Sequence, residues 1–238
     1  MVIAIIEFFN FGKVEKFSPH KIYTIIVSVL FFTYIFLFKN NILDIKYLVL
    51  SPALFLIPMI FELFKKSENP LINLGYTSLA VIYITLPFSL LNFLVFPKIN
   101  NNEFSYQLIF GLFWLIWTFD SGAYFAGSAF GKHKLFERIS PKKTWEGVIG
   151  GFIASFGMSY VMYLVFGTLK IHEWLIVSFI ISTTSIFGDL VESMLKRNFN
   201  IKDSGKIMPG HGGILDRIDS SLFSIPFVVI YLFLSEII

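Results

Sequence analysis

Residues Ser193–Asp219 read SMLKRNFNIKDSGKIMPGHGGILDRID and form a charge-dense stretch in an apolar chain. Eight of these 27 residues are charged, whereas 55% of the 238 residues of the chain are hydrophobic and only 15% are charged. His211 is followed by two glycines, and Asp216 and Asp219 stand three residues apart at the expected start of a helix. Ionisable groups are costly in an apolar chain, so this concentration indicates a place where chemistry is performed or ions are moved.

The composition is typical of an integral membrane protein. The mean hydropathy is +0.73, there are 30 phenylalanines, and apolar runs of about 20 residues recur along the chain. The chain has no cysteine, so any bound metal must be held by oxygen or imidazole ligands. The available carboxylates favour Mg²⁺, Mn²⁺ or Ca²⁺ over zinc.

Seven apolar segments are long enough to cross a bilayer as helices. They cover about Ile22–Phe38, Ile42–Phe64, Leu71–Phe96, Phe104–Phe125, Trp145–Gly167, Ile171–Glu192 and Ile218–Ile238. We therefore expect an all-α, polytopic helical bundle in three parts. These are a short apolar segment with its connector (1–21), N-terminal transmembrane helices (22–103) and a C-terminal transmembrane region that carries the site (104–238).

Local features of these segments lead to further expectations. Pro52 and Pro58 should bend the second segment, and Gly75 and Pro87 should break the third into two pieces. Residues 1–11 are apolar but have only about half the length of a span, which predicts an interfacial helix or the remnant of a span.

Two basic windows, 132–143 and 196–217, contain ten of the 19 lysines and arginines. This clustering indicates an anionic partner, although basic residues that only anchor the neighbouring spans are the alternative. Basic connectors alternate along the chain with connectors that carry few Lys or Arg residues. The positive-inside rule therefore places both basic windows in the cytoplasm and the C-terminus outside.

The first window belongs to the stretch DSGAYFAGSAFGKHKLFERISPKKTWEG, which begins at Asp120. Three glycines, Gly122, Gly127 and Gly131, permit close helix packing or a bent backbone. In SPKKTWEG we expect a helix to begin at Ser140, so that the two lysines add positive charge where free backbone N–H groups attract an anion. An ordinary cytoplasmic anchor for the next span is the alternative.

Four carboxylates lie near the cytoplasmic ends of three expected spans. Asp189 shares one helix face with Ser193 and Lys196, because the spacings are four and three residues. Glu192 lies within the same arc and can equally pair with Lys196. Asp216 and Asp219 share a face of the last span, and Asp120 ends the fourth.

This set of carboxylates suits Mg²⁺, which binds one or two carboxylates together with waters and substrate phosphates. Helix caps and Arg–Asp pairs are the alternative for one or two of the four. Divalent-metal carboxylates beside a basic clamp are typical of phosphoryl or nucleotidyl transfer, where catalysis is mostly positioning and charge neutralisation.

The stretch Ser193–Asp219 resembles, nearly position by position, the signature of the phosphatidate cytidylyltransferase (CDP-diacylglycerol synthase) family; we call it the signature stretch. The segments DSGAYFAG, SPKKTWEG and GDLVES also resemble this family, so the resemblance covers about the C-terminal half of the chain, from Trp114 onward. Members usually carry additional apolar segments before the position of Met1, and the region of Glu7 and Phe8 resembles the end of such a segment.

The resemblance implies that CTP and phosphatidic acid are converted to CDP-diacylglycerol and pyrophosphate, with Mg²⁺ required and a monovalent cation such as K⁺ sometimes beside it. It also implies a homodimer in the lipid bilayer of a bacterial cytoplasmic membrane, with the active site facing the cytoplasm and no nucleic-acid partner. A CTP-dependent lipid kinase and an ion-coupled transporter are the alternatives, and the released product separates the kinase from the transferase.

The resemblance assigns roles residue by residue. Asp189, Asp216 and Lys196 are the expected catalytic residues, and the expected metal carboxylates are Asp189, Asp216, Asp219 and Asp120. The expected nucleotide and phosphate contacts are Ser140, Lys142, Lys143, Thr144, Ser193, Lys196, Arg197, Lys202, Asp203, His211, Gly212, Gly213 and Arg217. His211 can also be a solvated loop residue and Lys202–Asp203 a local ion pair. Residues 198–209 either close over the nucleotide or only connect two helices.

Overall fold

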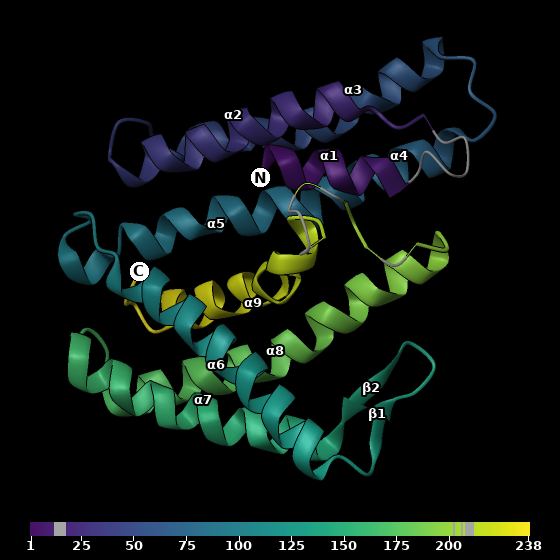
Figure 1. The fold of residues 1–238 in the computed structure, drawn as a ribbon. Coiled ribbons are helices and arrows are strands. Elements are labelled where there is room, and N and C mark those ends of the chain that lie inside the picture. Colours follow the sequence, from purple (N-terminus) through teal and green to yellow (C-terminus); the bar gives the residue numbers. More distant parts are fainter. Residues whose placement is uncertain (12–17, 202, 206, 208–211) are drawn as a thin grey trace. The chain divides into compact units, whose positions relative to one another are not determined.

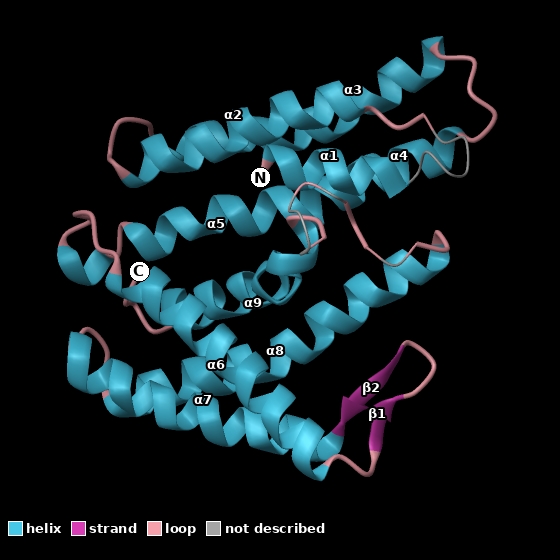
Figure 2. Ribbon diagram, viewed as in Figure 1, coloured by secondary structure: helices cyan, strands magenta, loops and turns pink. Residues whose placement is uncertain are grey.

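The computed structural model describes residues 1–11, 18–201, 203–205, 207 and 212–238, and their secondary structure is mainly helical (Figures 1 and 2). The α-helices are α1 (Val2–Phe11), α2 (Lys21–Lys39), α3 (Ser51–Phe64), α4 (Pro70–Ala80), α5 (Leu86–Val95), α6 (Gln107–Phe130), α7 (Trp145–Phe166), α8 (Ile171–Asn198) and α9 (Leu215–Leu234). Short 3₁₀ turns cover Ile45–Leu50 and Lys98–Asn100. An antiparallel hairpin joins β1 (Lys134–Phe136) to β2 (Ser140–Thr144).

The described residues contain seven helical segments that are long and apolar enough to cross a membrane, which confirms the expected polytopic helical fold. They are Lys21–Lys39, Ile45–Phe64, Pro70–Asn100, Gln107–Phe130, Trp145–Phe166, Ile171–Asn198 and Leu215–Leu234. Helix α8 has 28 residues and is therefore about 42 Å long. It exceeds the bilayer core of about 30 Å, and Lys196 and Arg197 lie in its last turn.

The third span is interrupted near Pro87, as the sequence predicts. A single π-helical turn, Val81–Thr85, separates α4 from α5. Proline has no backbone N–H and its ring crowds the preceding turn, so the regular hydrogen-bond pattern cannot continue through this point. Gly75, in contrast, lies inside α4 without interrupting it. In the second span Pro52 occupies the first turn of α3, where proline is tolerated, and Pro58 lies inside that helix.

The chain forms two compact units. The first contains Met1–Asn92 together with Asn198–Arg217, and the second contains Phe93–Arg197 together with Ile218–Ile238. Much of the signature stretch therefore folds with the N-terminal helices. Helix α1, expected to be interfacial or the remnant of a span, packs within the first unit: Ala4, Ile5 and Phe8 are fully buried.

In the second unit, α6 and α7 run side by side and small residues line their contact (Figure 1). A Cβ atom added at Gly122 would lie 2.6 Å from the Cβ of Ala154, and one added at Gly150 would overlap the Cβ of Ala126. Such close helix packing through small residues is typical of membrane proteins and confirms one expectation for the glycines. Helix α7 also contacts α8 through a hydrogen bond of 2.8 Å between the Ser155 and Ser178 hydroxyls.

The segment SPKKT forms strand β2, so the expectation that a helix begins at Ser140 is wrong. A residue before proline favours extended backbone, and the strand pairs with β1. Helix α7 begins after Thr144, whose hydroxyl accepts a hydrogen bond of 3.2 Å from the Gly147 N–H. The Glu146 carboxylate accepts hydrogen bonds from the backbone N–H of Lys132, at 3.1 Å, and that of His133. These contacts tie the hairpin to the start of α7.

Candidate active site

The acidic and basic side chains of α8 form local pairs. Asp189 and Ser193 are joined by a hydrogen bond of 3.2 Å from the Ser193 hydroxyl to Asp189 Oδ1. One turn further, Lys196 Nζ donates a hydrogen bond of 3.1 Å to the carboxylate of Glu192, which is only 1% exposed. Both pairs have the i, i+4 spacing that places side chains on one helix face. The sequence predicted the Asp189–Ser193–Lys196 face and left the partner of Glu192 open.

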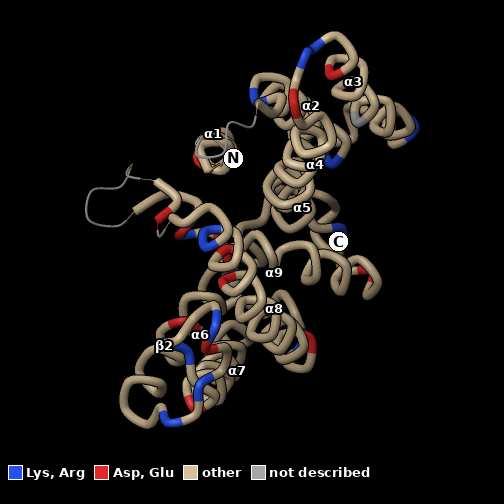
Figure 3. Tube along the Cα trace, turned by 90° about the vertical axis from the view of Figure 1, so that its right-hand side faces the viewer, with Lys and Arg blue, Asp and Glu red and all other residues tan. Residues whose placement is uncertain are grey.

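Strand β2 adds a basic residue to this group, because Lys143 Nζ forms an ion pair with Asp189. The two side chains are 27% and 35% exposed, so a substrate can still approach them. Lys142 is more exposed, since neighbouring residues of a strand point to opposite sides. Figure 3 shows acidic and basic positions gathered around β2 and the adjoining parts of α6 and α7.

Asp120 of α6 and Asp219 of α9 complete this cluster. Asp120 interacts electrostatically with Asp219, Asp189 and Lys143. Asp219 in turn interacts with Glu192 and lies within electrostatic range of Asp189. Three of the four predicted carboxylates are therefore brought together within the second unit. We call Asp120, Lys143, Asp189, Glu192, Lys196 and Asp219 the charged cluster.

Gly188 brings α8 and α9 close together beside the charged cluster. A Cβ atom at this position would lie 2.8 Å from the backbone oxygen of Asp219 and 3.0 Å from the Cα of Ser220. One turn earlier on α8, Thr184 donates a hydrogen bond of 2.8 Å to the Ser224 hydroxyl. The close contact therefore sets the spacing between Asp189, the residue after Gly188, and Asp219.

The donors of the charged cluster fit a hard divalent cation. Four carboxyl groups lie together with two lysines, so acidic groups outnumber basic ones, and each carboxyl group offers oxygen donors. Among the described residues, no group of three or more Asp, Glu or His side chains forms a ready metal site. This arrangement is compatible with Mg²⁺, which takes few protein ligands and completes its shell with water and phosphate oxygens.

Asp216 belongs to the first unit and lies in the first turn of α9, where its carboxylate accepts hydrogen bonds from backbone groups that precede the helix. Asp216 Oδ2 accepts hydrogen bonds of 2.9 Å from the N–H of Ser204 and of 2.9 Å from the N–H of Gly213. Gly212 has a φ angle of +84°, a backbone conformation that favours glycine. The predicted role of Asp216 as a metal ligand stays a prediction.

Glu7, which is not among the predicted site residues, also places its carboxylate in this region. Glu7 of α1 is 1% exposed and accepts hydrogen bonds from the N–H of Ile214, at 3.1 Å, and of Leu215, at 2.9 Å. An acidic residue inside an apolar segment is a signal for such a role, because a buried carboxylate needs partners.

The remaining predicted contacts are placed as follows. Thr144 caps α7, Ser140 begins β2, and Asp203, Arg197 and Arg217 are exposed. Lys202 and His211 lie outside the described residues, so their predicted contacts and a Lys202–Asp203 pair stay predictions.

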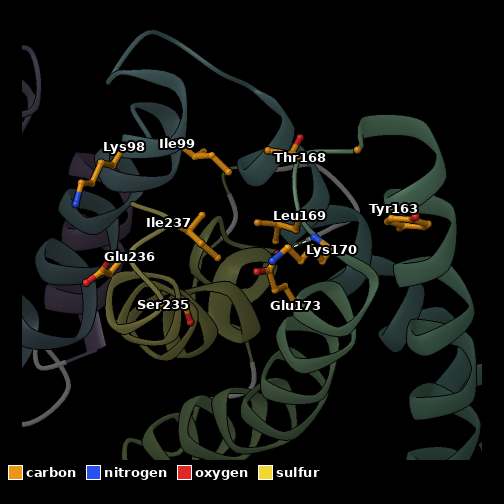
Figure 4. Close-up of a pocket in the computed structure, with 11 residues that line it drawn as sticks. Lys98, Ile99, Tyr163, Thr168, Leu169, Lys170, Glu173, Ser235, Glu236 and Ile237 are labelled. Atoms are coloured by element: carbon orange, nitrogen blue, oxygen red, sulfur yellow. Dashed lines mark hydrogen bonds between the residues drawn. The ribbon is translucent and has the colours of Figure 1, made fainter.

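A cavity of about 710 Å³ in the second unit lies away from the charged cluster. Figure 4 shows Thr168, Leu169 and Lys170 of the α7–α8 connector in its wall, together with Ile237 near the C-terminus. Glu173 also lines it, and Asp189 follows 16 residues later on the same helix, or about 24 Å along the axis. This cavity therefore does not contain the predicted site residues.

Comparisons with known proteins identify the family. The cytidylyltransferase family model matches residues 1–235. The chain is 43% identical over 159 residues to a phosphatidate cytidylyltransferase of Bacillus subtilis, a match that covers 66% of this chain and 57% of that protein. It is 44% identical over 131 residues to a phosphatidate cytidylyltransferase of Haemophilus influenzae, covering 53% and 46% of the two chains.

A third relative, a phosphatidate cytidylyltransferase of Staphylococcus saprophyticus, is 37% identical over 194 residues, which are 81% of this chain and 70% of the relative. The matches to the Bacillus and Haemophilus proteins span about half the length of those relatives. The family model, in contrast, covers nearly every residue of this chain. This chain therefore belongs to the cytidylyltransferase family.

Proposed function

We propose that this protein transfers the cytidylyl group of CTP to phosphatidic acid. A phosphate oxygen of phosphatidic acid attacks the α-phosphorus of CTP, and the bond from that phosphorus to the α–β bridging oxygen breaks. The products are CDP-diacylglycerol and pyrophosphate, which takes the electron pair of the broken bond. The attacking phosphate is already largely ionised near neutral pH, so the reaction needs no strong general base.

The charged cluster is the structural observation that carries this proposal. It combines several carboxylates with two lysines beside the Ser193 hydroxyl, which is the chemistry required to hold Mg²⁺ and triphosphate together. Membership of the cytidylyltransferase family and the names of the three relatives support the nucleotide and the lipid substrate.

Each residue has a proposed task in this reaction. Asp189, Asp219 and Asp120 would hold Mg²⁺, and a metal-binding role of Asp216 stays a prediction from the family resemblance. When bound, the cation would neutralise charge on the triphosphate and on the departing pyrophosphate. Lys143 would exchange its contact with Asp189 for a phosphate oxygen, and Lys196 would bind the triphosphate from α8. A monovalent cation beside Mg²⁺ stays a prediction.

We also propose that the charged cluster faces the cytoplasm and that the protein is a homodimer in a bacterial cytoplasmic membrane. The orientation is supported by the basic windows 132–143 and 196–217, which the positive-inside rule places on the cytoplasmic side. CTP and phosphatidic acid would then meet at the inner membrane surface. The dimer rests on the family resemblance alone.

Identification of the products tests the proposed reaction. Purified protein in phosphatidic acid micelles is incubated with Mg²⁺ and CTP labelled at the α-phosphate. We expect label in a chloroform-soluble CDP-lipid, together with free pyrophosphate and no CDP. Release of CDP with a phosphorylated lipid would instead indicate a lipid kinase, and incubation without phosphatidic acid is the control for hydrolysis.

Lysine substitutions in β2 should show whether these residues bind CTP or only anchor the neighbouring span at the membrane surface. We expect Lys143→Ala to raise the KM for CTP about tenfold, because a charge-assisted hydrogen bond to phosphate is lost. Lys142→Ala should have a smaller effect in the same direction, since this side chain is more exposed. The measurement is the CTP dependence of the initial rate. An unchanged KM in Lys143→Ala would leave both lysines with an anchoring role.

A further inference from the structure

Glu7 is an unusual residue for its surroundings, because helix α1 is otherwise mostly apolar and its side chain is only 1% exposed. Its carboxylate accepts hydrogen bonds from Ile214 N–H, at 3.1 Å, Leu215 N–H, at 2.9 Å, and the Ser204 hydroxyl, at 3.3 Å. All of these residues belong to the first unit. Residues about 200 positions apart in the chain are thereby joined.

The carboxylate meets the start of α9, where backbone N–H groups have no partner within the helix. Helix α9 begins at Leu215, so the N–H groups of Ile214 and Leu215 are among these unpaired donors. A negative charge at this end is further stabilised by the helix dipole. An N-terminal capping residue accepts hydrogen bonds from these N–H groups and adjoins the helix in the chain. Glu7 accepts them in the same way, but it belongs to a distant segment.

At two glycines the backbone lies so close to the Glu7 carboxylate that a Cβ atom would not fit between them. A Cβ atom at Gly205 would lie 2.5 Å from Glu7 Oε1, and one at Gly213 would lie 2.7 Å from Glu7 Oε2. Both glycines belong to the signature stretch. Larger residues at either position would displace the carboxylate or the backbone, so these glycines make room for Glu7.

Ser204 connects Glu7 to Asp216. Its hydroxyl donates to Glu7, its N–H donates to Asp216 Oδ2 at 2.9 Å, and its hydroxyl oxygen accepts a hydrogen bond of 3.3 Å from the Asp216 N–H. Displacement of Ser204 would therefore displace the Asp216 side chain as well.

Helix α1 is held firmly enough to act as the fixed end of this connection. Phe8, which follows Glu7, stacks on Tyr76 of α4 with ring centroids 4.6 Å apart. The Tyr76 hydroxyl donates a hydrogen bond of 2.7 Å to the Phe8 carbonyl. Phe11 contacts Phe199, just after α8, with ring centroids 6.3 Å apart.

We propose that Glu7 is a positioning residue of the enzyme: through Ser204 and the first backbone amides of α9, it holds Asp216 in its working position. The role in turnover rests on the proposed cytidylyl transfer, whereas the anchoring contact does not. Glutamate is required because three donors converge on one side chain. A glutamine amide would turn an N–H₂ group toward some of these donors.

The test compares two substitutions at Glu7 with a matched control. Glu7→Gln keeps the shape but removes the charge, and Glu7→Asp keeps the charge on a shorter side chain. Glu62→Gln is the control, because Glu62 is also a buried carboxylate of the first unit but binds His20, Ser67 and Asn73 instead. Amide hydrogen exchange, the kcat per folded protein and the Mg²⁺ concentration for half-maximal rate are measured for each full-length variant.

In Glu7→Gln we expect the amides of Ser204, Ile214 and Leu215 to exchange at least about tenfold faster, because hydrogen bonds to a charged acceptor are lost. The kcat should fall about 10- to 100-fold, as is typical when a residue that orients a metal-site ligand is changed. More Mg²⁺ should be needed, and Glu7→Asp should recover part of each effect. Glu62→Gln should leave the three amides and the kcat per folded protein near those of the wild type.

Two results would overturn the proposal. Unchanged exchange of the three amides in Glu7→Gln would show that Glu7 does not anchor the start of α9. Faster exchange with an unchanged kcat and Mg²⁺ dependence would show that the anchor has only a structural role. If the wild type makes no CDP-lipid, the proposed function fails, and the exchange measurement still decides whether the anchor exists.

Discussion

Replacement of Asp189 by asparagine should lower the kcat about 100-fold or more while the helices remain folded. Asparagine has the shape of aspartate but lacks the charge that would hold Mg²⁺, and it also leaves Lys143 without its ion-pair partner. The pair is partly exposed, so the loss in folding stability should be less than about 1 kcal/mol. Rates at increasing Mg²⁺, with thermal unfolding in detergent, measure the two effects separately.

Glu173→Gln is the control for Asp189→Asn. Glu173 lies in the first turn of the same helix, α8, where it accepts a hydrogen bond of 2.6 Å from the Lys170 N–H, and the glutamine oxygen can replace it there. This variant should keep normal turnover. Near-normal activity of Asp189→Asn at ordinary Mg²⁺ would mean that Asp189 is not a metal ligand.

The second large effect is expected for Gly188→Ala. The added methyl group would lie 2.8 Å from the backbone oxygen of Asp219 and 2.9 Å from the Phe223 Cβ, so α8 and α9 must move apart. That movement would separate Asp189 from Asp219, and a displacement of about 1 Å in a catalytic site can reduce the rate about 100-fold. The kcat per folded protein is the measurement, and we expect a smaller change in the KM for CTP.

Gly157→Ala is the matched control for this substitution. Gly157 lies inside α7, and a methyl group added there meets no atom within 4 Å. Alanine is also the better helix former by about 0.5–1 kcal/mol, so this variant should be at least as stable as the wild type and fully active. If Gly188→Ala were equally active, the close contact between α8 and α9 would not control the site.

Structural features that depend only on residues close together in the sequence could be predicted from it. The length of an apolar run decides whether a helix can span the bilayer, so seven spans could be read directly from the chain. The i, i+4 spacing likewise places Asp189 next to Ser193 and Glu192 within reach of Lys196. In both cases the partners are on one helix, and no knowledge of the tertiary structure is needed.

Other expectations required a partner that the sequence did not reveal. Strand β2 was expected to begin a helix, because lysines after a proline suit either structure and only pairing with β1 decides between them. The division at Asn92, with 198–217 folding alongside the N-terminal helices, depends on packing and not on the polarity of those residues. The sequence predicted Lys143 as a phosphate contact. Its ion pair with Asp189 could not be predicted, because the pair joins strand β2 to helix α8.

The sequence by itself therefore determined the membrane-spanning helices and the residue types at the site, because bilayer thickness and helix periodicity act locally along the chain. Only the tertiary structure decided which residues contact each other. It pairs Lys143 with Asp189, packs Gly188 against α9 and lets Glu7 bind the first backbone N–H groups of α9. These contacts depend on where two distant segments meet in space. The signature stretch shows by its residue types that it carries charge, but contacts such as that of Glu7 with Leu215 come from a distant part of the chain.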